Sequence, residues 1–315
     1  MSLSPVLDCW FLTGPTAGGK TGVGIELAGR IGAEIVSLDS MALYRGMDIG
    51  TAKPTPAERL AAAHHLVDVV EPHGEFSLAQ YLEAAGSAIR QIRERGREVL
   101  FVGGTPLYLK GLLRGIFRGP PADWEFRRQL EDEARREGPE HLLRRLAEVD
   151  PVAATRLHPN DTRRLVRALE VYEKTGRPIS EVQEQFDTGC PADACRVFVL
   201  DWPTAQLNRR IDRRVEAMFA AGLVEEVRSL LDQPRPLSKT AAQALGYREV
   251  IEHLQGRRDL VETIELVKTR TRQFAKRQRT WFRSLSECRF VRVEDPIDPA
   301  EVALRIAEAG LRQSS

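Results

Sequence analysis

One stretch decides the fold of this chain: Gly14-Pro15-Thr16-Ala17-Gly18-Gly19-Lys20-Thr21. It has the G-x-x-x-x-G-K-T pattern of a phosphate-binding P-loop. The apolar run Val6–Leu12 before it predicts a buried strand, and apolar residues at helical spacing over 23–28 predict a helix after it. In that context the glycines let successive N–H groups converge on a phosphate, Lys20 supplies a positive charge, and the Thr21 hydroxyl is placed to hold Mg²⁺. The alternative, a glycine turn that happens to contain Lys-Thr, does not account for the strand and helix on either side.

Composition bounds the class of protein. The chain has 315 residues, of which 42% are apolar and 29% charged, and its apolar runs are too short to span a membrane. The N-terminal Met1–Pro5 lacks the basic residues of a signal peptide, and the four cysteines lack the spacing of a zinc site or a disulfide framework. We therefore expect a cytoplasmic location. Because the net charge is only +1, any nucleic-acid surface must be a local patch.

The predicted elements indicate an α/β fold, with a P-loop NTPase-like parallel sheet core and a mostly helical insertion domain. Further strands are expected at Glu34–Asp39, Glu98–Thr105, Arg196–Leu200 and Arg289–Val293. The stretch 118–190 contains no convincing strand but has amphipathic periods at Asp123–Glu137, Glu140–Val149 and Asp161–Lys174. Later helices are expected at Ala205–Ala221, Ala241–Leu254, Leu260–Arg283 and Pro299–Leu311. We therefore assign residues 1–117 and 196–315 to the core and 118–195 to the insertion.

Two polar residues follow strands that should end beside the P-loop. In doubly wound sheets, binding sites form beyond the carboxyl ends of the strands, so Asp39 should lie near a bound phosphate. Asp39 could hold Mg²⁺, accept a proton from a nucleophile, or cap the following turn. Thr105, after Gly103 and Gly104, either caps the helix that begins at Pro106 or donates its hydroxyl to a leaving oxygen. The strand before Thr105 lacks the terminal Asp of a Walker-B magnesium site.

Arginines recur in pairs on two predicted helices. Arg210 and Arg214 lie four residues apart beside small residues, which suits a crevice wall that binds phosphate; the alternative is a solvated basic flank. Arg163 and Arg167 share a face near a helix N-terminus, where arginines can bind a phosphate backbone, although Asp161 there is equally a simple helix cap.

The stretch Leu266–Arg283 is the most basic part of the chain. It contains no acidic residue, and its cations are Lys268, Arg270, Arg272, Lys276, Arg277, Arg279 and Arg283. Charge runs are usually solvated faces, but one sign of charge with interleaved aromatic residues favours nucleic acid as the partner.

Several motifs, in order along the chain, carry a family resemblance. They are the P-loop, Asp39-Ser40-Met41-Ala42-Leu43-Tyr44, Met47–Pro54, Gly103-Gly104-Thr105, His158-Pro159-Asn160-Asp161, Ala244-Leu245-Gly246-Tyr247-Arg248 and Thr271–Gln278. Together they resemble the tRNA dimethylallyltransferases (isopentenyl-diphosphate:tRNA transferases). The chain ends soon after the basic helix, without the zinc-finger extension of eukaryotic relatives, so it resembles the bacterial form.

The resemblance implies transfer of the dimethylallyl group from dimethylallyl diphosphate to N6 of the adenosine immediately 3′ of the tRNA anticodon, with release of diphosphate. It implies that the P-loop holds the donor diphosphate with Mg²⁺ and that the helical insertion grips the anticodon stem-loop. Asp39 would engage the adenine amine, Thr105 would contact the bridging oxygen, and Arg127 and Arg214 would surround the leaving diphosphate. The implied tRNA-binding residues are Asp39, Ser40, Met41, Ala42, Arg163, Arg164, Leu165, Val166, Arg167, Gln243, Ala244, Leu245, Gly246, Tyr247 and Arg248. The basic helix adds Arg272, Lys276 and Arg277.

This chemistry agrees with the residues. Because the diphosphate leaves and a carbon is attacked, the P-loop serves as a clamp for the leaving group, and a Walker-B acid is less needed. An adenine amine is a poor nucleophile, and a carboxylate that accepts its proton contributes about 10²–10⁴ in rate. Two rival functions remain: a P-loop kinase of a nucleoside or small alcohol, and an NTP-dependent RNA-binding regulator without group transfer. No protein partner is indicated, and we expect a monomer.

Overall fold

The computed structural model describes residues 5–115, 119–182 and 189–311, which form two compact units. The core unit comprises Pro5–Leu113 together with the chain from Gly189 onward, and the helical unit lies between them in the sequence. The insertion expected at 118–195 differs from this division at its end, because residues 189–195 belong to the core unit.

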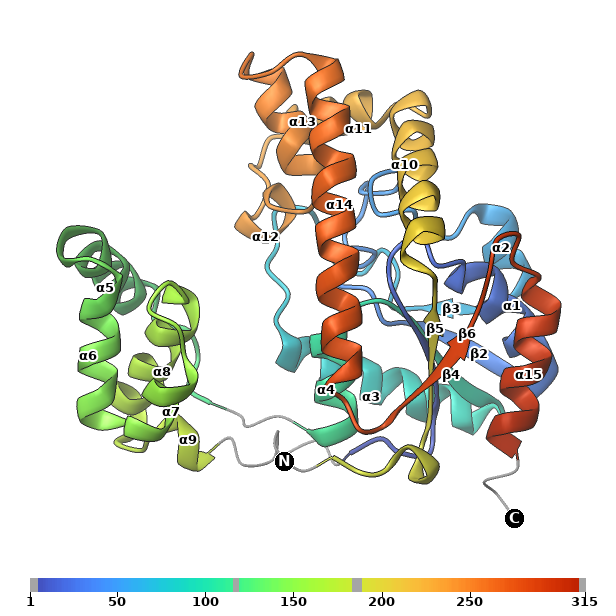
Figure 1. Ribbon diagram of the computed structural model, residues 1–315, viewed down its shortest axis with the longest axis horizontal. Helices are drawn as coiled ribbons and strands as arrows, with labels where there is room; N and C mark the ends of the chain where they lie inside the picture. Colours follow the sequence, from blue (N-terminus) through green and yellow to red (C-terminus); the bar gives the residue numbers. More distant parts are fainter. Residues whose placement is uncertain (1–4, 116–118, 183–188, 312–315) are drawn as a thin grey trace. The chain divides into compact units, whose positions relative to one another are not determined.

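The core unit is built on a parallel sheet (Figure 1). Within the described residues it has six strands in the order β3-β2-β4-β1-β5-β6, and every neighbouring pair is parallel. The strands are β1 (Trp10–Thr13), β2 (Ala33–Ser37), β3 (His64–His65), β4 (Glu98–Gly103), β5 (Arg196–Asp201) and β6 (Cys288–Arg292). The strand that leads into the P-loop, β1, lies between β4 and β5. The predicted α/β fold with a parallel sheet is therefore confirmed.

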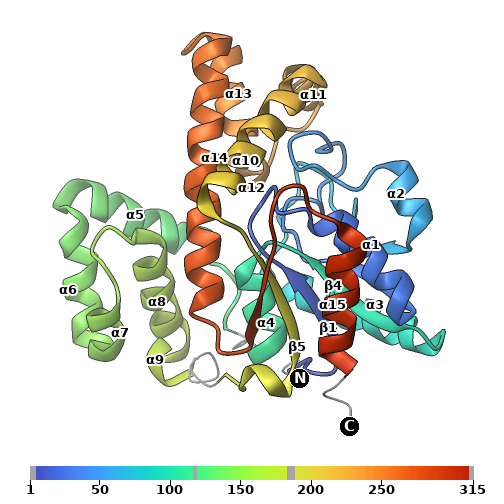
Figure 2. The ribbon, with the colours of Figure 1, turned by 45° about the vertical axis from the view of Figure 1, so that its right-hand side comes forward.

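Helices pack on this sheet and extend beyond it. In the core unit they are α1 (Lys20–Ile31), α2 (Pro56–Ala61), α3 (Leu78–Glu94), α4 (Pro106–Arg114), α10 (Thr204–Ala220), α11 (Leu223–Leu231), α12 (Lys239–Ala242), α13 (Tyr247–Leu254), α14 (Leu260–Arg283) and α15 (Pro299–Leu311), with a 3₁₀ turn at Ala192–Ala194. Figure 2 shows α1 beside α15 and α10 beside α14, and each of these pairs is in contact. No helix in the described part of the chain is long and apolar enough to cross a membrane.

Alternation along β1 decides which side chains face which layer. Trp10 and Leu12 join the apolar cluster that contains residues of α1 and α15. Phe11 points to the other face of the sheet, where its ring stacks on Phe101 with centroids 5.0 Å apart. All four side chains are buried, and burying a large apolar side chain contributes about 1.5–3 kcal/mol. The core therefore fixes the strand from which the P-loop starts.

One helix prediction was wrong, and a glycine is the reason. The single helix predicted at Ala241–Leu254 is divided into α12 and α13, because Gly246 has φ 91° and ψ −50°. The helix predicted at Ala205–Ala221 is α10, and Gly222, with φ 97°, separates it from α11. A right-handed helix cannot continue through a residue with positive φ.

The helical unit has an apolar core of its own. Its helices are α5 (Trp124–Glu137), α6 (Pro139–Val149), α7 (Pro151–Arg156), α8 (Thr162–Thr175) and α9 (Ile179–Val182). They pack around a cluster that includes Leu130, Leu142, Leu146 and Leu165. Among residues 119–182 there is no strand, as the sequence predicted.

Candidate active site

The P-loop curls tightly between β1 and α1. Gly14, Ala17 and Gly19 have positive φ angles of 145°, 59° and 80°, and the Gly18 N–H donates to the Pro15 carbonyl at 3.2 Å. A Cβ atom on Gly18 would lie 2.8 Å from that carbonyl oxygen, so only glycine fits this curl. The loop ends at the N-terminus of α1, where free N–H groups and the helix dipole favour an anion.

Side chains from the second part of the core support the loop from outside. Trp202 Nε1–H donates to the Gly18 carbonyl at 3.1 Å, and Arg210 Nε–H donates to the Ala17 carbonyl at 3.0 Å. Arg210 also pairs with Asp295 at 2.7 Å, and its guanidinium lies 4.5 Å from the centre of the Trp202 ring. Arg210 is thus occupied in holding the loop.

Three charged side chains share one electrostatic environment at the loop. Lys20 Nζ donates to the carbonyls of Gly14 at 3.1 Å and Pro15 at 2.7 Å. Burial, and after it the charge of Arg214, lowers the pKa of Lys20 to about 8, while Asp39 acts in the opposite direction. Burial also lowers the pKa of Arg214, again against the charge of Asp39. The structure therefore brings together two cations and a carboxylate that the sequence had placed on separate elements.

Asp39 and Thr105 lie in the turns after β2 and β4. Asp39 Oδ1 accepts the N–H of Met41 at 2.8 Å and that of Ala42 at 3.4 Å, so the carboxylate does cap its turn. The Thr105 hydroxyl accepts the Ser40 N–H at 3.0 Å and lies 3.4 Å from the Ser40 hydroxyl. Thr105 thus ties the turn after β4 to the turn that carries Asp39.

Thr21 is the predicted Mg²⁺ ligand. Its side chain is partly exposed at the second residue of α1, and its hydroxyl has no partner among the described residues. The described residues contain no group of three or more His, Cys, Asp or Glu side chains that could hold a metal. Both features fit Mg²⁺, which usually takes one or two protein oxygens and completes its shell with substrate phosphates and water.

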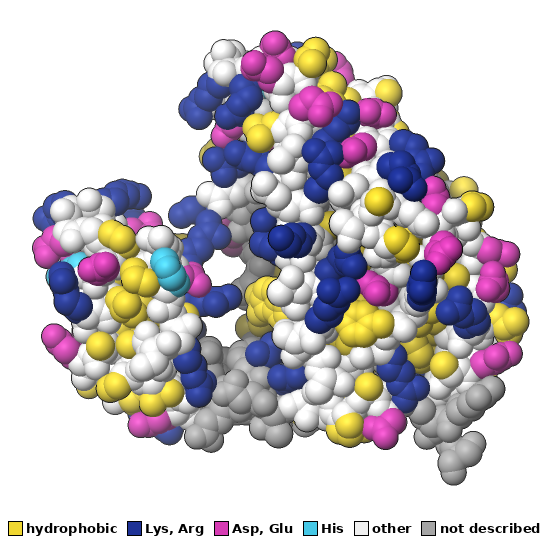
Figure 3. Space-filling view, viewed as in Figure 1, with side chains coloured by type: hydrophobic (Ala, Val, Ile, Leu, Met, Phe, Trp, Pro, Cys, Tyr) yellow, Lys and Arg dark blue, Asp and Glu magenta, His cyan; other side chains and the backbone are white. Residues whose placement is uncertain are grey.

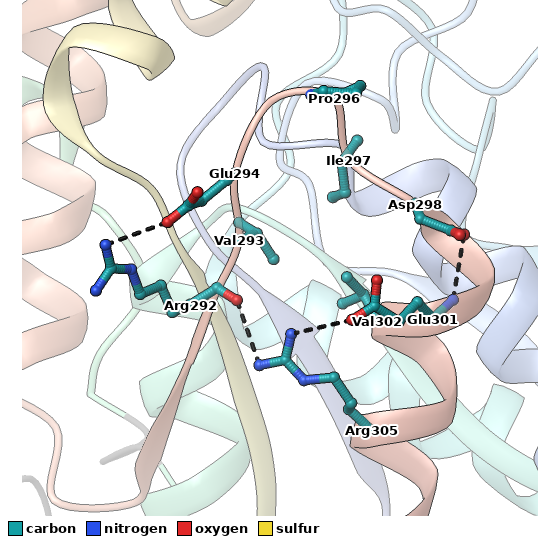
Figure 4. Close-up of a pocket in the computed structure, with 9 residues that line it drawn as sticks. All are labelled: Arg292, Val293, Glu294, Pro296, Ile297, Asp298, Glu301, Val302 and Arg305. Atoms are coloured by element: carbon teal, nitrogen blue, oxygen red, sulfur yellow. Dashed lines mark hydrogen bonds and ion pairs between the residues drawn. The ribbon is translucent and has the colours of Figure 1, made fainter.

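A surface hollow of about 350 Å³ lies between the end of β6, the loop after it and α15 (Figure 4). Its charged side chains interact with one another: Arg292 pairs with Glu294 at 3.1 Å, and Arg305 pairs with Glu301 at 4.0 Å. Asp298 accepts the Glu301 N–H at 3.2 Å. None of the predicted site residues lines this hollow, so it is not the candidate active site.

The charge of α14 is more compensated than its sequence suggests. Figure 3 shows Lys and Arg side chains along the surface that α14 occupies, with acidic side chains among them. Five of the seven cations pair with acids: Lys268 with Glu216 and Glu265, Arg270 with Glu249, Arg272 with Asp212, and Arg279 and Arg283 with Asp201. These five cations are therefore partly neutralised in the folded protein, and the predicted tRNA contact of Arg272 stays a prediction.

Lys276 and Arg277 are the cations of this helix that stay available. Both are exposed, and neither has an acidic partner among the described residues. The Arg277 guanidinium lies 6.0 Å from the ring centre of Phe274, which is 37% exposed. This pair of exposed cations beside an exposed ring has the composition of a nucleic-acid contact.

The predicted tRNA-binding residues outside α14 differ in exposure. The exposed ones are Gln243, Arg248, Arg163 and Arg164, and the partly exposed ones are Asp39, Ser40, Met41, Leu245 and Arg167. The buried ones are Ala42, Leu165, Val166, Ala244, Gly246 and Tyr247.

In the helical unit, the buried carboxylate of Glu170 accepts hydrogen bonds from two arginines. Arg127 donates to it twice, at 2.8 and 2.7 Å, and Arg167 donates at 2.5 Å. Burial alone would raise the pKa of Glu170, but the hydrogen bonds from these two arginines outweigh burial and lower it. The predicted contacts of Arg127 with diphosphate and of Arg167 with tRNA stay predictions, and here both side chains hold the helical unit together.

The IPP transferase family model matches residues 42–285. The chain belongs to this family. A tRNA dimethylallyltransferase from Rhodopirellula baltica is 50% identical over 291 residues, covering 90% of this chain and 87% of the relative. One from Geobacter metallireducens is 50% identical over 285 residues, covering 90% of this chain and 92% of the relative. The family predicted from the motifs is thus confirmed.

Solved structures agree with the sequence relatives. The full-length tRNA isopentenylpyrophosphate transferase from Bacillus halodurans has a TM-score of 0.69 and 35% identity, covering 98% of each chain. A eukaryotic dimethylallyltransferase acting on tRNA has a TM-score of 0.74 and 28% identity, covering 92% of this chain and 75% of that chain. The fold of this chain is therefore that of its solved relatives.

Sequence reasoning missed the polar side chains that connect the family's motifs. Glu226 accepts the backbone N–H groups of Asp48, Ile49 and Gly50 and the hydroxyl of Tyr247, at 2.6–3.2 Å. It thus joins the motif 47–54 to the motif 244–248. Gln278 was also missed, although a signal was present: it falls on the buried stripe of α14, where a polar residue is unusual.

Proposed function

We propose that the protein transfers the dimethylallyl group of dimethylallyl diphosphate to N6 of the adenosine 3′ of the anticodon in tRNA and releases diphosphate. One observation carries the proposal: Lys20 and Arg214, cations suited to a diphosphate, share their surroundings with Asp39, a carboxylate suited to accept a proton. Family membership supplies the reaction class, and relatives named tRNA dimethylallyltransferase supply the substrates.

In this reaction the bond between the allylic carbon and the bridging oxygen breaks, and its electrons stay on the oxygen. The P-loop N–H groups, Lys20 and Arg214 bind the diphosphate, and the Thr105 hydroxyl donates to the bridging oxygen. Donors aimed at a position where negative charge develops stabilise the transition state more than the ground state. Mg²⁺ held by Thr21 and the phosphates would neutralise further charge on the leaving group. The sequence places glycines rather than an acid at the end of β4, so no carboxylate there repels the diphosphate.

The acceptor supplies the electrons of the new bond. The N6 lone pair forms the carbon–nitrogen bond, and the N6 proton passes to the Asp39 carboxylate. Its Oδ1 is already held by two backbone N–H groups, from Met41 and Ala42. General-base assistance of this kind contributes about 10²–10⁴ in rate.

The tRNA requires a surface for its phosphates. Lys276 and Arg277 are proposed to bind the backbone from the core unit, and Arg163 and Arg164 are proposed to bind it from the helical unit. All four side chains are exposed.

The test is incubation with labelled dimethylallyl diphosphate, Mg²⁺ and total tRNA, followed by digestion and analysis of the nucleosides. The expected product is N6-dimethylallyl adenosine, formed only when tRNA is present and lost in Lys20→Ala. Turnover of ATP with no prenyl transfer would instead support a kinase or an NTP-dependent RNA-binding protein, and would overturn the proposal.

A further inference from the structure

Gln278 is a polar side chain on the buried stripe of α14. It is 4% exposed, and the stripe also contains Thr271, Ala275 and Phe282. A helix that only packed against the core would gain more from an apolar residue here. A buried amide is tolerated when its hydrogen-bonding groups are satisfied, so its partners show what it is for.

The two ends of the amide reach two different loops. Oε1 accepts the Thr16 N–H of the P-loop at 2.9 Å. Nε2 donates to the Gly104 carbonyl, in the turn after β4, at 2.6 Å. Because one partner is a donor and the other an acceptor, the orientation of the amide is fixed by its partners. The side chain therefore acts as a spacer between the P-loop and the turn that carries Thr105.

The contact is close-packed around Gly104. A Cβ atom there would lie 2.7 Å from Gln278 Nε2, 3.2 Å from the Gly14 carbonyl oxygen and 3.4 Å from Lys20 Nζ. Gly104 thus lies next to Gly14 and Lys20 of the P-loop, with no room for a side chain between them. The NH₂ group of Gln278 satisfies the Gly104 carbonyl at this close approach.

We propose that Gln278 is a positioning residue for the donor diphosphate. It holds the P-loop and the Thr105 turn at a fixed spacing by binding the Thr16 N–H and the Gly104 carbonyl. The inference rests on the proposed function, because it takes a prenyl diphosphate as the ligand of the loop. Lys276 and Arg277 are exposed at the adjoining positions. The buried face of α14 therefore positions the donor site, and its exposed face contacts the tRNA.

Gln278→Glu gives the sharpest test, because its side chain can be switched by pH. A protonated Glu presents an oxygen to the Thr16 N–H and an O–H to the Gly104 carbonyl, as Gln does. An ionised Glu cannot donate and places a negative charge beside the diphosphate. Burial raises the pKa of such a carboxyl. The ratio of variant to wild-type Kd for dimethylallyl thiodiphosphate with Mg²⁺ is expected to be near one at pH 5.5 and about tenfold or more at pH 8.

Gln278→Met removes both hydrogen bonds at similar volume. It is expected to weaken the analogue about tenfold at every pH and to raise the donor KM more than it lowers kcat. The matched control is Gln273→Met, because Gln273 is the same residue type on the same helix with an exposed side chain. This control is expected to leave the Kd of the analogue, measured without RNA, unchanged.

The outcomes separate the inference from the proposed function. Thermal unfolding first confirms that each variant is folded. Wild-type Kd values in both Gln278 variants at both pH values would refute the positioning role. A loss that is equal in the Glu and Met variants and independent of pH would reduce Gln278 to packing, and would overturn it too. Failure of the wild-type protein to bind the prenyl diphosphate would instead refute the proposed function itself.

Discussion

Binding of the prenyl diphosphate should be accompanied by proton uptake at Lys20. In the free protein, burial and the neighbouring charge of Arg214 lower the pKa of this side chain to about 8. A bound diphosphate places several negative charges beside the amine and favours its protonated form. Above pH 8 the side chain must therefore take up a proton before it can neutralise the ligand.

The pKa of about 8 sets the size of the effect. At pH 8.5 about a quarter of the Lys20 side chains carry the proton, so binding should take up roughly 0.75 proton, compared with about 0.1 at pH 7. If only the ammonium form binds, Kd should be about eightfold weaker at pH 9 than at pH 7.5. The second pKa of a phosphate is about 6, so the donor itself stays ionised over this range.

Calorimetric titration of dimethylallyl thiodiphosphate in two buffers of different ionisation enthalpy measures the number of protons taken up. Lys20→Arg is the control, because an arginine keeps its charge throughout this pH range. It should bind with a Kd independent of pH and with no uptake, even if its affinity is lower. A wild-type Kd that stays constant between pH 7.5 and 9, without uptake at pH 8.5, would refute the reasoning.

Three further predictions concern stability, chemistry and RNA binding. Folding lowers the pKa of Lys20 from 10.5 to about 8. The unfolded state therefore binds more protons between these values, so below pH 8 the charge costs at most about 3 kcal/mol of stability. Lys20→Met should raise the midpoint of thermal unfolding at pH 7 and abolish transfer. An unchanged or lower midpoint would contradict the lowered pKa of Lys20. Asp39→Ala should lower single-turnover transfer about 10²–10⁴-fold while the Kd for tRNA changes far less, and near-normal turnover would return Asp39 to its capping role. Lys276→Ala should reduce the slope of log K against log salt for tRNA by about one, whereas Lys268→Ala, whose ammonium is held by two glutamates, should leave it unchanged. A slope in Lys276→Ala equal to that of the wild-type protein would show that Lys276 makes no phosphate contact.

Helix bounds that are marked by nearby capping residues or prolines could be predicted to the residue. The basic helix was predicted at Leu260–Arg283 and the last helix at Pro299–Leu311, and both have these bounds. The Asp259 side chain caps the first of them by accepting the Glu262 N–H at 2.8 Å, and Pro299 fits the first turn of the other. The P-loop followed in the same way, because its glycines, strand and helix adjoin one another in the chain.

The sequence by itself determined the family and the parallel α/β core, and it predicted the residues around which a diphosphate site would form. Only the tertiary structure decided which charges are free and which polar groups hold the loops. Lys268 meets Glu216 from 52 residues away, and Gln278 meets Thr16 from 262 residues away. An acid of another helix partly neutralises the cation beside it, and a buried amide between two loops holds those loops together. Neither fact can be read from a stretch of chain, because the free energy of a charge or a buried polar group depends on partners that only folding brings near.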